Sequence, residues 1–131
     1  MTRLLIVAAG GALGAVARYG VGAWALRLFP AATWPLGTLA VNVVGGLLMG
    51  LLTGWLAFRG GLHSESIRLF AAVGLLGGFT TFSAFSLESA LMIERRQFAM
   101  AAGYVAISVV LSITALFVGL MVARRAFGAA L

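Results

Sequence analysis

The sequence predicts an all-α integral membrane protein with four transmembrane helices. Of its 131 residues, 63% are hydrophobic and only 9% are charged, and the mean hydropathy is +1.12. A soluble domain carries about 25% charged residues. Four apolar stretches have the roughly 20 residues that a membrane-spanning helix needs. The chain also has 18 glycines, roughly twice the usual frequency, which favours closely packed membrane helices.

The four expected spans cover residues 4–28, 36–58, 66–93 and 98–123. Pro30 and Pro35 bracket the first loop, and arginines or glycines stand at the other ends. The apolar start is interpreted as the first span rather than a signal peptide, because further spans follow it. The loops are too short for a domain outside the membrane, so we expect residues 1–131 to form a single four-helix transmembrane domain.

The charge balance points to membrane anchoring and excludes several other functions. All nine cations are arginines, giving a net charge of +6, and they stand singly or in pairs between apolar runs. This pattern indicates anchors at the membrane interface rather than a nucleic-acid-binding face. There is no cysteine, and the lone histidine, His63, lies in a polar loop. Zinc sites, thiol chemistry and enzyme active sites are therefore not expected.

The distribution of the arginines leaves the membrane orientation open. With four spans, four or five arginines lie on one side and three on the other. The first group is Arg3, Arg59, Arg124 and Arg125 with Arg68 close by, and the second is Arg27, Arg95 and Arg96. Positive charge favours the cytoplasmic side, but this bias is weak. Either the chain still takes one orientation, or it inserts both ways and pairs antiparallel with itself.

Glycines recur at four-residue spacing in two of the expected spans. Gly10 and Gly14 lie in the first span, and Gly46, Gly50 and Gly54 lie in the second. Residues at this spacing share one face of a helix, and small residues on that face allow neighbouring backbones to approach closely. The spacing therefore predicts packing seams between helices but does not indicate an activity.

The middle of the third expected span combines Gly77 and Gly78 with Thr80 and Thr81. Glycine and β-branched threonine both disfavour a continuous helix, so we expect a break in mid-membrane. In lipid such a break is tolerated only inside protein or beside a cavity, because its freed amides and carbonyls need partners. Two interpretations remain open. The nearby threonine and serine hydroxyls satisfy the break alone, or its backbone groups bind ions.

Three side chains, two of them beside this break, are candidates for contact with an anion. Phe82 and Phe85 share one helical face, and the positive edges of their rings suit an anion in a pore. Their alternative role is ordinary contact with lipid or core. Asn42 lies inside the second span, where its amide either donates to an anion or forms an interhelical hydrogen bond.

Further candidates lie on the fourth, first and third spans. Tyr104, Ser108 and Ser112 follow at four-residue steps, and their hydroxyls either donate to an anion or bond back to a carbonyl one turn earlier. Arg18 lies inside the first span, where a charge is costly. Either it faces a wet vestibule or a partner, or its side chain extends to the membrane interface. Glu88, the only acid within a span, either pairs with an arginine or lines an aqueous path.

Three blocks of the sequence resemble the Fluc (CrcB-type) family of fluoride channels. The blocks are GGALGAVARY at residues 10–19, GTLAVNVVG at residues 37–45 and GGFTTFSAF at residues 77–85. They occur in this order in a four-span chain, and the resemblance covers nearly all of it. One departure is Ala84, where the family often has a threonine. This change removes one hydroxyl near the two phenylalanines.

The resemblance implies an antiparallel, dual-topology homodimer in the bacterial inner membrane, with two pores that conduct fluoride passively. Such channels let cytoplasmic fluoride leave down its electrochemical gradient and confer fluoride resistance. The resemblance also implies Arg18 in the vestibule and a structural sodium ion at the dimer interface, held by the backbone carbonyls of Gly77 and Thr80 from both subunits. The residues that it assigns to the fluoride pore are Asn42, Phe82, Ser83, Phe85, Glu88, Tyr104, Ser108 and Ser112.

Two functions from other classes are less consistent with the sequence. A small four-helix proton-coupled drug exporter is also an antiparallel dimer, but it needs a carboxylate in the first helix, and residues 4–28 contain none. A non-conducting structural subunit leaves the break and the hydroxyl stripe unexplained. A fluoride-selective pore must replace tightly held water with close donors, which Asn42 and the hydroxyls supply. The sequence therefore favours a fluoride channel.

Overall fold

The computed structural model describes residues 1–59, 61 and 63–128. In these residues the regular structure is helical throughout, and four helical segments are long and apolar enough to cross a membrane. These segments are Thr2–Leu28, Leu36–Phe58, Ser64–Glu94 and Phe98–Gly128. The predicted all-helical architecture with four helices suited to membrane spans is confirmed in these residues.

Three of the spans are single helices: α1 (Thr2–Leu28), α2 (Leu36–Phe58) and α6 (Phe98–Gly128). The amide of Phe29 closes α1 on the Ala25 carbonyl at 2.9 Å, and Pro35 stands at the N-cap of α2. The last helix continues past residue 123, where the sequence predicted its end. Arginine is a good helix former, so a pair of arginines marks the membrane interface without ending the helix.

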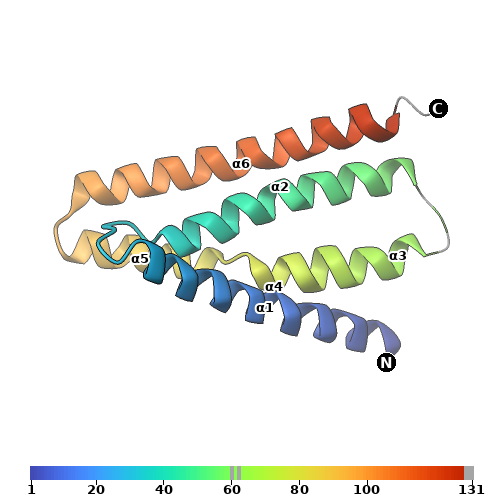
Figure 1. Ribbon diagram of the computed structural model, residues 1–131, viewed down its shortest axis with the longest axis horizontal. Helices are drawn as coiled ribbons and strands as arrows, with labels where there is room; N and C mark the ends of the chain where they lie inside the picture. The colour runs from blue at the N-terminus through green and yellow to red at the C-terminus, as the bar shows by residue number, and fades with distance from the viewer. Residues whose placement is uncertain (60, 62, 129–131) are drawn as a thin grey trace.

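The third span is composed of several elements in series. These are α3 (Ser64–Ile67), the π-helix η1 (Arg68–Leu76), α4 (Gly77–Phe79) and α5 (Phe82–Glu94). Between α4 and α5, Thr80 (φ −80°, ψ 157°) and Thr81 (φ −151°, ψ 112°) have extended backbones. Figure 1 shows this short non-helical stretch between α4 and α5. The π-helical geometry of η1 is a feature that the sequence did not predict.

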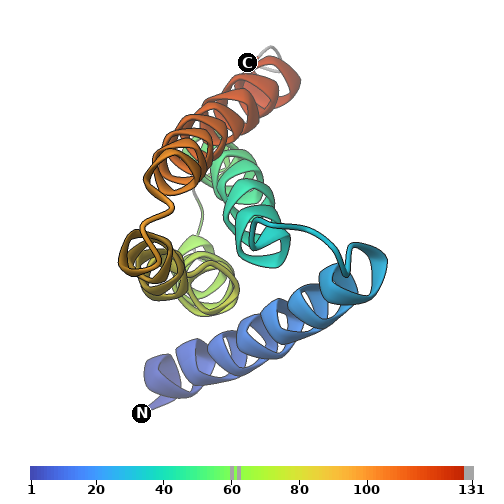
Figure 2. The ribbon, with the colours of Figure 1, turned by 90° about the vertical axis from the view of Figure 1, so that its left-hand side faces the viewer.

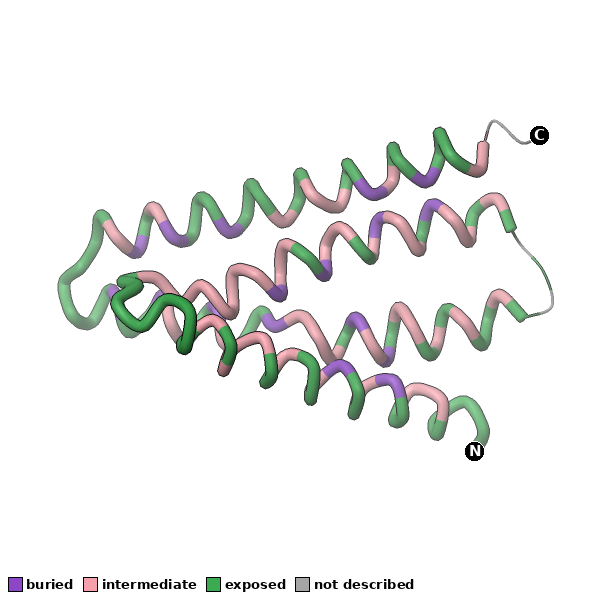
Figure 3. Tube along the Cα trace, in the orientation of Figure 1, coloured by how far each residue is buried: buried purple, intermediate pink, exposed green. Residues whose placement is uncertain are grey.

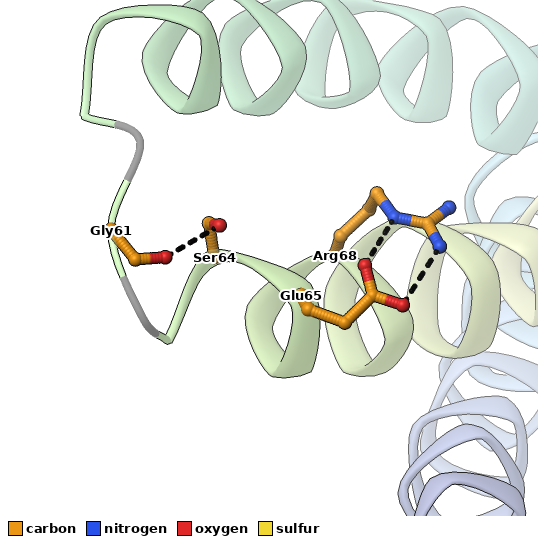
Figure 4. Close-up of polar contacts among 4 residues, drawn as sticks. All are labelled: Gly61, Ser64, Glu65 and Arg68. Carbon is orange, nitrogen blue, oxygen red and sulfur yellow. Dashed lines mark hydrogen bonds and ion pairs between the residues drawn. The ribbon is translucent and has the colours of Figure 1, made fainter.

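Local polar contacts order the start of the third span (Figure 4). The Ser64 hydroxyl donates to the Gly61 carbonyl at 2.7 Å, and Arg68 forms an ion pair with Glu65, with Nε 3.3 Å from Oε2. Both charged side chains are about half exposed. The N-terminus and the end of α6 lie at the same end of the molecule (Figure 1).

The helices pack as two close pairs, α2 against α6 and α1 against η1 and α4 (Figure 2). Glycines lie at both contacts. A Cβ on Gly50 would collide with the Leu116 carbonyl and lie 2.9 Å from the Leu120 nitrogen, and a Cβ on Gly14 would collide with the Leu75 carbonyl. The backbones approach this closely because glycine has no side chain. The predicted glycine seams are therefore packing surfaces within one chain.

Few side chains are buried in the single chain, and the buried positions recur along the inner faces of the helices (Figure 3). A small apolar core joins α5 to α6, formed by Phe85, Met92, Ala101 and Tyr104. Trp34, from the loop between α1 and α2, packs against this core. Large apolar side chains elsewhere face outward, as expected for a surface that meets lipid or another protein.

Candidate functional site

Asn42 holds the interruption of the third span by two hydrogen bonds. Its Nδ2 donates to the Thr81 carbonyl at 3.0 Å, and its Oδ1 accepts from the Thr81 amide at 2.8 Å. Of the two alternatives that the sequence offered for Asn42, the interhelical hydrogen bond is thus formed, and its partner is the backbone of Thr81. These bonds satisfy polar groups that the helix cannot satisfy itself. They use one of the two Nδ2 hydrogens, so a second donor remains.

The two threonines satisfy part of the interruption with their hydroxyls. Thr80 Oγ1 donates to the Leu76 carbonyl at 2.9 Å, and Thr81 Oγ1 accepts from the Ala84 amide at 3.1 Å as the N-cap of α5. In a continuous α-helix, the amides of Thr81 and Ala84 would donate to the carbonyls of Gly77 and Thr80. Both amides instead donate to side-chain oxygens. The carbonyls of Gly77 and Thr80 therefore lose their helical donors.

A cavity of about 420 Å³ adjoins the interruption, between α2, α5 and α6. Its wall is mostly apolar, but it includes a group of polar and aromatic side chains that are far apart in the sequence. These residues are Asn42, Thr80, Thr81, Phe82, Phe85, Ser108 and Ser112. The cavity therefore contains neutral donors and aromatic rings, without a charged side chain among its lining residues.

Phe82 and Phe85 form a pair at the start of α5. Their ring centroids are 5.5 Å apart and the rings are inclined at 45°. Phe85 is buried, whereas Phe82 is 78% exposed in the single chain. The Phe85 ring also lies 5.5 Å from the ring of Tyr104. The structure thus places both phenylalanines at the cavity, one buried and one exposed.

Ser108 differs from two of the three serines of α5 in the use of its hydroxyl. Ser86 and Ser89 donate to the carbonyls one turn earlier, at 2.9 and 2.7 Å. Ser108 is 5% exposed, and within the described part of the chain its hydroxyl has no hydrogen-bond partner. A buried polar group without a partner is costly. Because Ser108 lines the cavity, its hydroxyl is available to whatever occupies that space.

Glu88 is bound by two hydroxyl groups. Thr38 Oγ1 donates to its Oε1 at 2.6 Å, and the Tyr104 hydroxyl donates to its Oε2 at 2.7 Å. Glu88 also lines a second cavity, of about 210 Å³, beneath the loop between α1 and α2. In the part of the chain that the structure describes, the arginine–carboxylate pair is Glu65–Arg68, so Glu88 faces a cavity rather than an arginine.

Not all predicted site residues meet at one place. Arg18 is half-buried and lines a third cavity, of about 220 Å³, that also includes Thr81 and Ala84. Ser83 is exposed, and its hydroxyl lies 3.3 Å from that of Thr81. Tyr104 is fully buried behind Phe85 and reaches Glu88 instead of the large cavity.

Sequence reasoning missed the roles of Thr38 and Trp34. Thr38 precedes Asn42 by four residues on α2, so the two polar side chains share a face, and this spacing was an available signal. The position of Trp34 depends on the path of a loop. Its ring centroid lies 6.2 Å from that of Tyr104, and no helical periodicity could have indicated this contact.

The fold and this site define a class: a multi-pass helical membrane protein with a cavity of neutral donors and aromatic rings at an interruption of its third span. A family model described as CrcB-like protein, Camphor Resistance (CrcB), matches residues 5–120. The chain belongs to this family.

Curated relatives align along nearly the whole chain. A protein of Caulobacter sp. (strain K31) is 63% identical over 127 residues, which is 97% of this chain and 98% of the relative. A protein of Phenylobacterium zucineum (strain HLK1) is 60% identical over 128 residues, 97% of this chain and 99% of its own length. Both are named fluoride-specific ion channel FluC.

Proposed function

We propose that this protein is a fluoride-selective ion channel, which lets cytoplasmic fluoride leave passively across the bacterial inner membrane and so confers fluoride resistance. Membership of the CrcB family and relatives that are 60 and 63% identical and named for this activity support the proposal. The family is one of ion channels, so the protein is not an enzyme. The four apolar helices are consistent with a multi-pass membrane location.

The observation that carries the proposal is the buried Ser108 hydroxyl, which has no hydrogen-bond partner among the described residues and lines the same cavity as Asn42 and Phe85. Fluoride is small and strongly hydrated, so a selective pore must offer donors that replace its water. Hydroxyl and amide N–H groups supply such donors, and the ring edges of the phenylalanines carry partial positive charge. A wide pore with fixed cations would favour chloride instead.

The proposed pathway follows the polar groups from one end of the site to the other. Asn42, Phe82, Ser83 and Phe85 contact the anion beside the interruption, and Ser108 and Ser112 extend the path along α6. Tyr104 and Glu88 continue it toward the second cavity, where Glu88 keeps both oxygens occupied by hydroxyl donors. Arg18 attracts anions from the vestibule by its positive charge.

We place the functional unit in an antiparallel, dual-topology homodimer with two pores. In the single chain the Phe82 ring is 78% exposed although it lines the cavity, so a pore wall is missing on that side. A second copy supplies this wall most simply. The weak arginine bias between the two ends of the bundle allows insertion in both orientations. Labelling from one side of the membrane tests this assembly: it should modify about half of the copies, and labelling of all copies or none would contradict it.

A structural sodium ion at the dimer axis fits the chemistry of the interruption. The carbonyls of Gly77 and Thr80 lack the amide donors of a continuous helix, and neutral carbonyl oxygens suit a hard monovalent cation. Two copies related by a two-fold axis bring four such oxygens together. Sodium would then stabilise the dimer without being used as a gradient. Prolonged exchange into a large organic cation should promote dimer dissociation, and stability independent of sodium would contradict this role.

Purified protein in liposomes loaded with fluoride or chloride provides the main test of function. We expect electrogenic fluoride efflux that needs neither a proton nor a sodium gradient, together with strong rejection of chloride. Liposomes loaded with the same anions but without protein provide the control for leakage. Equal rates for the two anions, or efflux strictly dependent on a proton gradient, would overturn the proposal.

A further inference from the structure

Trp34 connects the loop between α1 and α2 to the buried tyrosine of the proposed pathway. Its ring centroid lies 6.2 Å from that of Tyr104, with the rings inclined at 58°. Tyr104 in turn lies 5.5 Å from Phe85, which lies 5.5 Å from Phe82. The four rings therefore form a continuous series from the end of the bundle to the large cavity.

The surroundings of Trp34 keep its ring in place. Pro35 follows it, and the carbonyl of Trp34 accepts from the Leu36 amide at 2.9 Å, which ties the loop to the start of α2. On α6, Gly103 provides the space for the indole, because a Cβ there would lie 3.2 Å from Trp34 Cζ2. An aromatic side chain held on both sides has little freedom to change rotamer.

Trp34 contacts Tyr104, which is fully buried, and also lines the 210 Å³ cavity that contains Glu88 and Thr38. Removing the indole would leave unfilled space beside the Tyr104 ring. We expect the ring to gain freedom to turn, so that its hydrogen bond to Glu88 would compete with water.

We propose that Trp34 is a positioning residue that holds the Tyr104 hydroxyl on Glu88. The bond keeps one oxygen of the Glu88 carboxylate occupied, so that less of its negative charge faces an approaching anion. This role rests on the proposed fluoride conductance, but the position of Tyr104 can be measured without it.

Protection of the Tyr104 hydroxyl from chemical acetylation tests directly whether Trp34 holds it in place. The chain has two tyrosines, so a Tyr19→Phe background leaves Tyr104 as the only target for N-acetylimidazole, a water-soluble reagent for exposed tyrosine hydroxyls. We expect protection in this background and in Trp34→Phe, and acetylation in Trp34→Ala. Trp24→Ala, which removes a 63% exposed indole from α1, is the matched control and should keep Tyr104 protected. Protection of Tyr104 in Trp34→Ala would overturn the proposal.

Fluoride efflux from liposomes supplies the second measurement. Trp34→Ala should lower the rate about tenfold, the effect of losing one hydrogen bond to a charged group. Trp34→Phe should keep most of the efflux rate, and Trp24→Ala should leave the rate unchanged. Lower efflux with Tyr104 still protected would overturn the positioning role. A different result is acetylation of Tyr104 in Trp34→Ala when the protein without this substitution shows no fluoride efflux. That result would support the positioning role and contradict the proposed function.

Gly103→Ala tests the same contact while the indole is retained, and it guards against poor folding of Trp34→Ala. Its methyl group would lie 3.2 Å from Trp34 Cζ2, so the indole would have to shift by a few tenths of an ångström. We expect a smaller change in the same direction, with partial acetylation of Tyr104 and a smaller loss of efflux. Full protection together with unchanged efflux would count against the proposal.

Discussion

The two halves of α2 have different surroundings on the same helix. In the C-terminal half, Gly50 and Gly54 meet α6 so closely that a Cβ on Gly50 would collide with the backbone of Leu116. In the N-terminal half, Thr38 and Asn42 bind Glu88 and Thr81, and Asn42 lines the 420 Å³ cavity. We call the C-terminal half closed, because its glycines let the backbones of α2 and α6 touch, and the N-terminal half open, because its polar side chain Asn42 reaches a cavity.

The largest expected effect comes from placing a side chain in the closed half. Gly50→Val should cost about 3 kcal/mol or more in stability, because the obstacles are backbone atoms of α6 that cannot rotate away. Thermal unfolding and gel filtration in detergent would measure this loss. Gly20→Val is the matched control, since a Cβ there meets nothing within 4 Å. Equal stability of the two variants would contradict the distinction between closed and open regions.

In the open half, Asn42→Asp should have the next largest effect. A carboxylate has no N–H to donate to the Thr81 carbonyl, and its charge repels an anion in the cavity. We expect fluoride efflux to fall about a hundredfold, equivalent to about 3 kcal/mol. The variant should still elute as a folded dimer. Unchanged efflux would assign Asn42 a purely structural role.

Replacing the aromatic pair separates ring chemistry from simple bulk. Phe82→Ile and Phe85→Ile each keep a large apolar side chain but remove the positive ring edge, so efflux should fall about tenfold in each. Phe117→Ile, at an exposed position that does not line the cavity, is the control. If all three variants conduct equally well, the rings act only as packing groups.

The smallest effect is expected from Ser108→Ala. The Ser108 hydroxyl has no hydrogen-bond partner in the described part of the chain, so its removal should lower efflux about fivefold, equivalent to about 1 kcal/mol, while stability stays the same or rises. Ser89→Ala removes a hydroxyl that already donates to the Phe85 carbonyl, so it should affect stability more than efflux. The reverse pattern would show that the Ser108 hydroxyl does not serve the anion.

Part of this molecule could be predicted from local sequence. Long apolar runs determine four membrane helices, because a helix satisfies its own backbone polar groups in lipid. Glycines at four-residue spacing predicted the seams, since that spacing defines a helix face. The aromatic pair and the hydroxyl stripe were identified as candidates for the same reason, although their contact with fluoride stays a prediction.

The tertiary structure alone decided which polar groups meet. Asn42 pairs with the backbone of Thr81, 39 residues away, and Thr38 donates to Glu88, 50 residues away. Periodicity describes one helix at a time and does not determine which neighbour a polar face meets. The packing of the helices determines these contacts, because a buried donor must find an acceptor among the backbone and side-chain groups that packing brings within reach.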